Sequence, residues 1–121
     1  MSHKILVVDD DAEYREMLMT LLCGAGYIVV CAEDGSAGFE QAGREGPNLI
    51  LTDLSMPNLN GVEMIKAIRA EQETRAVPII ACTAHLSGVA VSEALAAGAN
   101  RALYKPIKFN VLVALIIKLL S

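Results

Sequence analysis

The stretch LILTDLSMPNLNG, residues 49–61, changes from a short apolar run to a polar loop at a single aspartate, Asp53. The loop carries Pro57 and two asparagines before it reaches Gly61. An ionised carboxylate at the end of a buried strand is costly to hold, so it either caps a neighbouring group or takes part in chemistry. The apolar run predicts a strand, and the loop predicts a turn into a helix whose N-cap is Asn60.

The same alternation of a short apolar run and a longer segment of helical period occurs along the whole chain. The predicted strands are residues 4–9, 27–33, 48–53, 77–83 and 101–105, and the predicted helices lie within residues 11–26, 35–46, 60–72, 87–99 and 110–121. This alternation predicts an α/β fold, with a five-stranded parallel sheet flanked by five helices. The runs are apolar throughout, as expected where helices cover both faces.

The expected strand order is 2-1-3-4-5, that of a doubly wound, flavodoxin-like domain. The sequence contains no repeat, linker or low-complexity tract. We therefore expect residues 1–121 to form a single domain.

The composition limits the class of partner. The chain has 121 residues, 54% of them hydrophobic, which is enough for one ordinary core. Its formal net charge of −4 disfavours direct binding to nucleic acid. The N-terminus lacks a signal-peptide hydrophobic region and no apolar run reaches the ~20 residues of a membrane span, so we expect a cytoplasmic protein without membrane contact. Cys23, Cys31 and Cys82 lack a C-x-x-C pairing and are predicted to be reduced core thiols.

Polar side chains stand where four of the predicted strands end. The first run ends in Asp9 and Asp10, the third in Asp53, the fourth in Thr83 and the fifth in Lys105. Because parallel strands end at one edge of the sheet, where ligands bind, we expect these side chains to meet.

The charges of the predicted cluster indicate which ligand and which reaction it suits. Carboxylates ~4 Å apart repel by about 4 kcal/mol per pair at an effective dielectric of ~20, so a proton or a cation must join the three aspartates. Hard oxygen ligands without His or Cys favour Mg²⁺. Lys105 adds a positive charge and Thr83 a hydroxyl, so the site would stabilise negative oxygens added to Asp53. Phosphoryl transfer to a carboxylate suits this arrangement.

Taken together, the motifs ILVVDDD, LTDLSMPNLNG, ACTA, ALAAGAN and YKP resemble the receiver domain of two-component response regulators, the family of the small chemotaxis receiver. The resemblance covers essentially the whole chain. It implies that Asp53 accepts a phosphoryl group from a phosphohistidine of a sensor histidine kinase or a histidine phosphotransfer protein, so that the chain is a signalling switch rather than an enzyme. It also implies that Asp10 and Asp53 ligate Mg²⁺ with the backbone carbonyl of Ser55, while Asp9 assists through water.

The resemblance assigns further roles around the phosphoryl group. It implies that Thr83 and Lys105 bind the phosphoryl oxygens and that the bond between Lys105 and Pro106 is cis, which makes a tight turn. His85, two residues past Thr83, and Ser55, two past Asp53, occupy positions that in the family shape water access to the acyl phosphate. Their side chains should therefore tune the lifetime of the phosphorylated state.

One position departs from the family pattern. Receivers commonly carry Tyr or Phe three residues before the lysine, and this chain has Ala102 there. Tyr104 lies two residues further on, hence on the same face of the strand. It is either a displaced switch or a partly buried packing residue. Coupling between Asp53 and an output surface is therefore less well defined than phosphorylation itself.

The last predicted helix is unusually apolar, with ten of the thirteen residues from Phe109 to Ser121 apolar. The predicted inward face of this helix consists of Phe109, Leu112, Val113, Ile116, Leu119 and Leu120. Three further apolar residues then lie on its flanks, namely Val111, Leu115 and Ile117. Either the helix fits deeply between its neighbours, or it forms a homodimer or effector interface together with the sparsely charged helix within residues 87–99.

Three other functions are compatible with parts of this pattern. An aspartyl-phosphate phosphohydrolase places a second aspartate two residues after the nucleophile, where this chain has Ser55. A flavin-binding module of the same architecture offers hydroxyls and amides after the first strand, where this chain has Asp9, Asp10 and Asp11. A degenerate receiver would keep the fold as a phosphorylation-independent interaction module, yet the required side chains are all present. The cognate kinase, the pathway and the output effector do not follow from the sequence.

Overall fold

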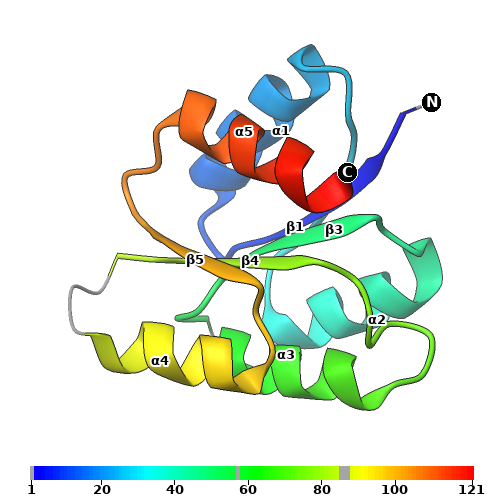
Figure 1. Cartoon of the computed structure of the whole chain (residues 1–121), viewed down its shortest axis with the longest axis vertical. Coiled ribbons are helices and arrows are strands. Elements are labelled where there is room, and N and C mark those ends of the chain that lie inside the picture. The colour runs from blue at the N-terminus through cyan, green and yellow to red at the C-terminus, as the bar shows by residue number, and fades with distance from the viewer. Residues whose placement is uncertain (1, 57, 85–87) are drawn as a thin grey trace.

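A computed structural model describes residues 2–56, 58–84 and 88–121. Five strands form one sheet in the order β2-β1-β3-β4-β5, and every neighbouring pair is parallel (Figure 1). The strands are β1 (Lys4–Val8), β2 (Ile28–Ala32), β3 (Leu49–Asp53), β4 (Ile79–Thr83) and β5 (Arg101–Tyr104). The predicted fold class and strand order are confirmed, and each strand lies within its predicted run.

Five helices connect and follow the strands: α1 (Ala12–Gly24), α2 (Gly35–Glu45), α3 (Gly61–Ala70), α4 (Gly88–Ala97) and α5 (Phe109–Leu120). Figure 1 shows α1 and α5 together on one face of the sheet and α2, α3 and α4 on the other. Alternate residues of each strand point to opposite faces, so the sheet divides the apolar interior into two layers.

The two layers differ in the helices that fill them. On one face, Ile5, Val7, Leu49 and Leu51 of the sheet pack with buried residues of α1 and α5, of which Leu22 is one. On the other face the central strands pack against α2, α3 and α4 through a second set, which includes Leu6, Val8, Ile50, Met64, Ile65 and Ile68. The strands β3 and β4 are buried along their whole length, which fixes the positions of their last residues.

Three polar side chains cap the starts of helices, and the sequence predicted one of these caps. The Asn60 side chain accepts a hydrogen bond from the backbone N–H of Glu63, which confirms it as the N-cap of α3. Asp34 caps α2, and Asp11, the third acid of the N-terminal triplet, caps α1. Asp11 therefore satisfies backbone donors at the start of α1.

Some predictions about individual side chains were wrong. Cys23 is exposed rather than a core thiol, while Cys31 is half-buried and Cys82 is buried. On α5, Leu115 contacts the core, whereas Val113 is not among the described residues that do. Both lie about 80° from the centre of the buried face at 100° per residue, so periodicity could not separate them.

The remaining expectations concern the membrane and two single residues. Within the described ranges, no helix has both the length and the apolarity that crossing a membrane requires. Pro57 and His85 lie outside the described residues, so the predictions that concern them stay predictions.

Candidate functional site

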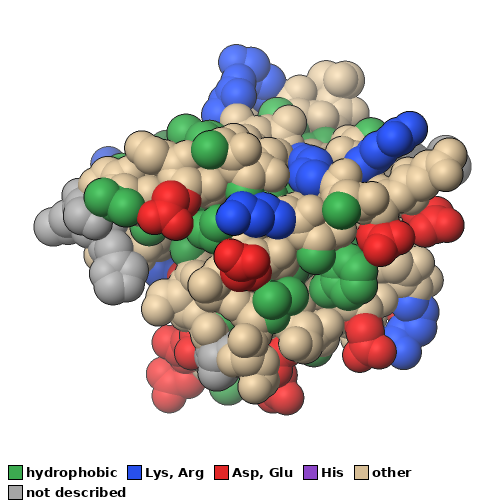
Figure 2. All heavy atoms as spheres, turned by 90° about the horizontal axis from the view of Figure 1, so that it is seen from below, with side chains coloured by type: hydrophobic (Ala, Val, Ile, Leu, Met, Phe, Trp, Pro, Cys, Tyr) green, Lys and Arg blue, Asp and Glu red, His purple; other side chains and the backbone are tan. Residues whose placement is uncertain are grey.

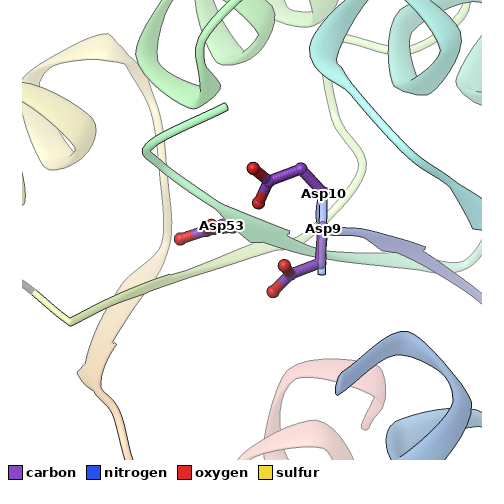
Figure 3. A group of neighbouring side chains, drawn as sticks. All are labelled: Asp9, Asp10 and Asp53. Carbon is purple, nitrogen blue, oxygen red and sulfur yellow. The ribbon is translucent and has the colours of Figure 1, made fainter. Parts of the chain in front are cut away.

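Three aspartates meet at the carboxyl end of the sheet. Asp53 is the last residue of β3, and Asp9 and Asp10 follow β1. One carboxylate oxygen from each lies within 4.8 Å of the others. Figure 3 shows the three side chains from these two neighbouring strands gathered at the same edge. Asp9 and Asp53 are buried, whereas Asp10 is exposed, so the cluster opens to solvent on the side of Asp10.

Lys105 closes the other side of this cluster. It follows β5 directly, and its Nζ atom lies 2.8 Å from an oxygen of Asp9 and 3.7 Å from an oxygen of Asp53. Its backbone N–H donates to the carbonyl of Thr83, which ties the ends of β5 and β4 together. The bond between Lys105 and Pro106 is cis, as expected.

Thr83 lies at the same edge as the aspartates. It is the last residue of β4 and is buried. β4 pairs with β3, with Cys82 opposite Asp53 in the register. The structure thus brings together all five strand-end residues that the sequence selected, namely Asp9, Asp10, Asp53, Thr83 and Lys105.

The electrostatic environment of the cluster perturbs two of its groups. Burial raises the pKa of Asp53, and the negative charge of Asp9 adds to this, although Lys105 opposes it. Burial alone would lower the pKa of Lys105, but its hydrogen bond to Asp9 and the charges of Asp53 and Asp9 raise that pKa above its ordinary value. The lysine is therefore a permanent cation at neutral pH, and holding Asp53 ionised is costly without a further positive charge.

The oxygens of the cluster fit a small divalent cation. Within the described residues the Asp10 carboxylate has no hydrogen-bond or ion-pair partner, so it is available as a ligand. Both oxygens of Asp9 are already engaged, one by the backbone N–H of Asp11 and the other by Lys105. Carboxylate oxygens with no nitrogen or sulfur ligand are the set that Mg²⁺ prefers, with water completing its coordination.

The loop after Asp53 is held against the rest of the protein. The Asp53 side chain accepts a hydrogen bond from the backbone N–H of Leu54. Asn58 has a positive φ of 68° and donates a side-chain hydrogen bond to Asp34 at 2.8 Å. A Cβ atom at Gly61 would overlap the backbone of Asp53 and Leu54, so this position requires glycine.

Ser55 lies in this loop, two residues after Asp53. It is exposed, and it lines a pocket of about 500 Å³ between the loop, α3 and α4. The expectation that its side chain affects water access to Asp53 stays a prediction. The role of its backbone carbonyl as a metal ligand stays a prediction.

Tyr104 is more exposed than a packing residue would be. The residue is 44% exposed at the end of β5, whereas Ala102 is half-buried and packs on the layer of α2, α3 and α4. The expectation of a partly buried packing tyrosine was therefore wrong, because the residue is exposed where the strand ends. Whether Tyr104 acts as a displaced switch stays a prediction.

Sequence reasoning missed one neighbour of Lys105. The ring of Tyr14, in the first turn of α1, lies with its centroid 4.3 Å from the Lys105 Nζ atom. Tyr14, Leu18 and Leu22 form an apolar stripe on α1 that faces the layer between the sheet, α1 and α5, and this periodicity alone indicates a packing residue. The place of Tyr14 one turn after the acidic triplet is the signal that could have identified it, since α1 starts at the edge where the strand ends meet.

Comparison with known proteins gives a consistent assignment. The sequence model of the response regulator receiver domain matches residues 5–117. The DNA-binding response regulator MtrA of Mycobacterium tuberculosis H37Rv is 38% identical over 114 residues, covering 94% of this chain and 49% of MtrA. The chain thus spans about half the length of this relative.

Solved structures agree over the whole length of the fold. The chemotaxis protein CheY4 of Vibrio cholerae superimposes with a TM-score of 0.91 at 31% identity, covering 98% of this chain and 99% of CheY4. The receiver domain of the sensor histidine kinase PA1611 from Pseudomonas aeruginosa PAO1 superimposes with a TM-score of 0.92 at 32% identity, covering 99% of this chain and 98% of that one. That structure carries a magnesium ion in its active-site cleft.

Proposed function

The chain belongs to the response regulator receiver domain family, and we propose that residues 1–121 act as one phosphorylation-dependent switch of a two-component system, with Asp53 as the phosphoacceptor. The observation that carries this proposal is the cluster of Asp9, Asp10 and Asp53 with Lys105 at one edge of the sheet. The phosphoryl donor in this proposal is a phosphohistidine of a sensor histidine kinase or a histidine phosphotransfer protein.

Phosphoryl transfer requires an oxygen nucleophile in a fixed position. An oxygen of the Asp53 carboxylate forms a bond to phosphorus, while the bond from phosphorus to the histidine nitrogen breaks and the nitrogen keeps the electron pair. β3 is buried along its length, so it holds this carboxylate at the strand end, and Leu54 fixes its orientation through the backbone hydrogen bond. Positioning of this kind supplies much of the catalysis in phosphoryl transfer.

The charges around Asp53 favour a phosphorylated product. Lys105 lies 3.7 Å from the Asp53 carboxylate and can bind a phosphoryl oxygen once one is added there. The hydroxyl of Thr83 is proposed to bind a second oxygen. A Mg²⁺ ion held by Asp10 and Asp53, with Asp9 acting through water and the Ser55 carbonyl as a further ligand, would neutralise charge on the transferring group.

The lifetime of the phosphorylated state depends on access of water to Asp53. We propose that the side chains of Ser55, two residues after Asp53, and His85, two residues after Thr83, limit this access. Ser55 is exposed next to the site, which is consistent with such a role. Receiver domains of this family are signalling proteins, and the self-dephosphorylation proposed here ends the signal without any separate substrate.

The output surface is proposed to lie on α4, β5 and α5. Large apolar side chains are exposed on all three elements: Val89, Leu95, Tyr104, Val111 and Ile117. Glu93 is the only charged residue of α4. Figure 2 views the molecule from the side of α3 and α4 and shows apolar side chains between single acidic and basic ones rather than one basic patch. Such a surface suits a second copy of the chain or a protein effector.

Intact mass spectrometry tests the phosphoacceptor directly. The chain is incubated with acetyl phosphate and Mg²⁺, and we expect one phosphoryl adduct that disappears with EDTA or with Asp53→Asn. Glu16→Gln removes one exposed negative charge on α1 and serves as the matched control, which should keep the adduct. Absence of an adduct on the wild-type chain would favour a phosphorylation-independent interaction module. An adduct on Asp53→Asn would place the acceptor elsewhere.

A further inference from the structure

Tyr14 contacts the active-site lysine from a helix that the proposed mechanism does not otherwise use. Its ring centroid lies 4.3 Å from the Nζ atom of Lys105, well inside the range of about 6 Å for a cation–π interaction. In the described part of the chain, the Lys105 ammonium group lies next to the Asp9 carboxylate, the Asp53 carboxylate and the ring of Tyr14. The aromatic ring lies on the α1 side of the sheet.

The position of Tyr14 is fixed by the same acidic triplet that forms the site. The Asp11 side chain accepts hydrogen bonds from the backbone N–H groups of Glu13 and Tyr14, which sets the first turn of α1. The Asp9 carbonyl accepts a hydrogen bond from the side chain of Arg15, the next residue of that turn. The ring of Tyr14 then packs against the apolar layer between the sheet and α1 and α5. Tyr14 is therefore held from both its backbone and its side chain.

The contact is one between a cation and a neutral ring. Burial raises the pKa of Tyr14 to about 12, so the phenol stays protonated at neutral pH. The ring therefore attracts Lys105 through its π face and does not form an ion pair with it. It leaves the charge of the ammonium group available for other anions.

A lysine side chain needs a neighbouring group to hold its ammonium in place more than a rigid side chain does. Its ammonium sits on a flexible four-carbon stem that can adopt many conformations, and its three donors can point at any nearby acceptor. Asp9 alone would draw Lys105 away from Asp53, because the distance to Asp9 is 2.8 Å and the distance to Asp53 is 3.7 Å. The ring on a further side restricts the ammonium to the space next to both carboxylates.

We propose that Tyr14 is a positioning residue for phosphoryl transfer, whose ring holds the Lys105 ammonium where it meets the oxygens of a phosphoryl group arriving at Asp53. This inference rests on the proposed function of Asp53. It predicts that loss of the ring slows phosphorylation even when the donor is a small molecule that makes no contact with the outer surface of α1. The hydroxyl of Tyr14 has no part in this role.

Three variants and a matched control test the proposal. Tyr14→Phe keeps the ring, Tyr14→Leu replaces it with an aliphatic group, and Tyr14→Met is a second ring-free variant that adapts better to the core. Tyr27→Leu is the control, because Tyr27 also packs against the α1 and α5 layer. It precedes the first residue of β2, at the edge of the sheet opposite the site. Urea unfolding of each variant shows which remain folded.

The first measurement is the rate of adduct formation with acetyl phosphate and Mg²⁺ over a range of acetyl phosphate concentrations. We expect Tyr14→Leu and Tyr14→Met to lower the maximal rate by about tenfold, and Tyr14→Phe and Tyr27→Leu to remain within about twofold of the wild type. The second measurement is the NMR shift of the Lys105 CεH₂ protons. The ring current of Tyr14 should move this signal upfield in the wild type and in Tyr14→Phe but not in the two ring-free variants.

Each outcome decides between the alternatives. A folded ring-free variant that is phosphorylated at the wild-type rate would refute the positioning role, as would Tyr14→Phe reacting as slowly as Tyr14→Leu. An unshifted Lys105 signal in the wild type would show that the contact does not exist in solution. If the wild type forms no adduct although the Lys105 signal is shifted, the proposed function of Asp53 fails while the contact stands.

Discussion

The three clustered aspartates predict that Asp53→Asn stabilises the metal-free protein at neutral pH. Removing a charged side chain from a functional site commonly does not lower the free energy of unfolding when neighbouring groups of like charge repel that side chain. Here Asp53 is buried, and its carboxylate lies within 4.8 Å of oxygens of both Asp9 and Asp10. Asparagine has nearly the same shape and no charge, so the substitution removes the repulsion without leaving a cavity.

The magnitude follows from the distances. At an effective dielectric of about 20, a separation of 4.8 Å, which is the upper limit for the Asp9 and Asp53 oxygens, gives a repulsion of about 3.5 kcal/mol. The attraction of Asp53 to Lys105 at 3.7 Å is about 4.5 kcal/mol on the same scale, so these two contributions nearly cancel. Asp10 is exposed, and with the dielectric of water its repulsion adds about 1 kcal/mol. Burial of the Asp53 charge acts in the same direction, so we expect a gain of about 1 to 2 kcal/mol.

The gain should depend on pH in a defined direction. Burial raises the pKa of Asp53 in the folded protein above its ordinary value of 3.8. Protonation of Asp53 therefore stabilises the folded wild type; that stabilisation is fully present below pH 3.8 and is lost as the pH rises through the raised pKa. The advantage of Asp53→Asn should accordingly appear above the raised pKa and vanish in acid.

Urea unfolding followed by circular dichroism measures this difference, with EDTA and with Mg²⁺. In EDTA the variant should unfold at higher urea, and by heat about 4 °C higher for each kcal/mol in a chain of this length. Mg²⁺ at ten times its Kd should stabilise the wild type by about 1.4 kcal/mol, which closes or reverses the gap. Glu16→Gln should show neither effect. If metal-free Asp53→Asn is no more stable than the wild type, the proposed repulsion between the three carboxylates is refuted.

Four further substitutions, two beside the site and two away from it, are compared through the urea midpoint. Asn60→Ala removes the N-cap of α3 and should cost about 1 kcal/mol, with unchanged metal dependence. Gly61→Ala forces a Cβ into the backbone of Asp53 and should cost about 2 kcal/mol and slow phosphorylation, whereas Gly43→Ala, with nothing within 4 Å, should be neutral or stabilising. Arg69→Met removes donors to the carbonyls of Val77 and Gly98 and should cost about 2 kcal/mol.

The residues at the strand ends could be predicted from sequence because topology alone brings them together. In a parallel sheet each strand ends at the same edge, so an aspartate after β1, another at the end of β3 and a lysine after β5 must meet once the strand order is known. Their separation in sequence does not matter to this argument. Asp9 and Lys105 are 96 residues apart and form an ion pair of 2.8 Å.

The same reasoning could not separate residues that differ only in three-dimensional detail. Three consecutive acids follow β1, yet only Asp9 and Asp10 reach the cluster, while Asp11 accepts hydrogen bonds from α1 as its N-cap. An aspartate suits either role, and the choice depends on where the helix begins, within one residue. Tyr14 was missed for a related reason, since an apolar stripe does not show which of its members reaches the end of the sheet.

Ala102 occupies the position where receivers commonly carry Tyr or Phe, and this difference has a physical consequence. An alanine side chain has no rotamers, so the inward and outward movement of a ring cannot occur at this position. Ala102 packs in the layer of α2, α3 and α4, and Tyr104, on the same face of β5, is exposed at its end. The contacts that Lys105 does make lead instead to Asp9, to Thr83 through the backbone and to Tyr14 on α1. A movement of this lysine toward a phosphoryl group on Asp53 would therefore change a contact at the start of α1, on the opposite face of the sheet from Ala102.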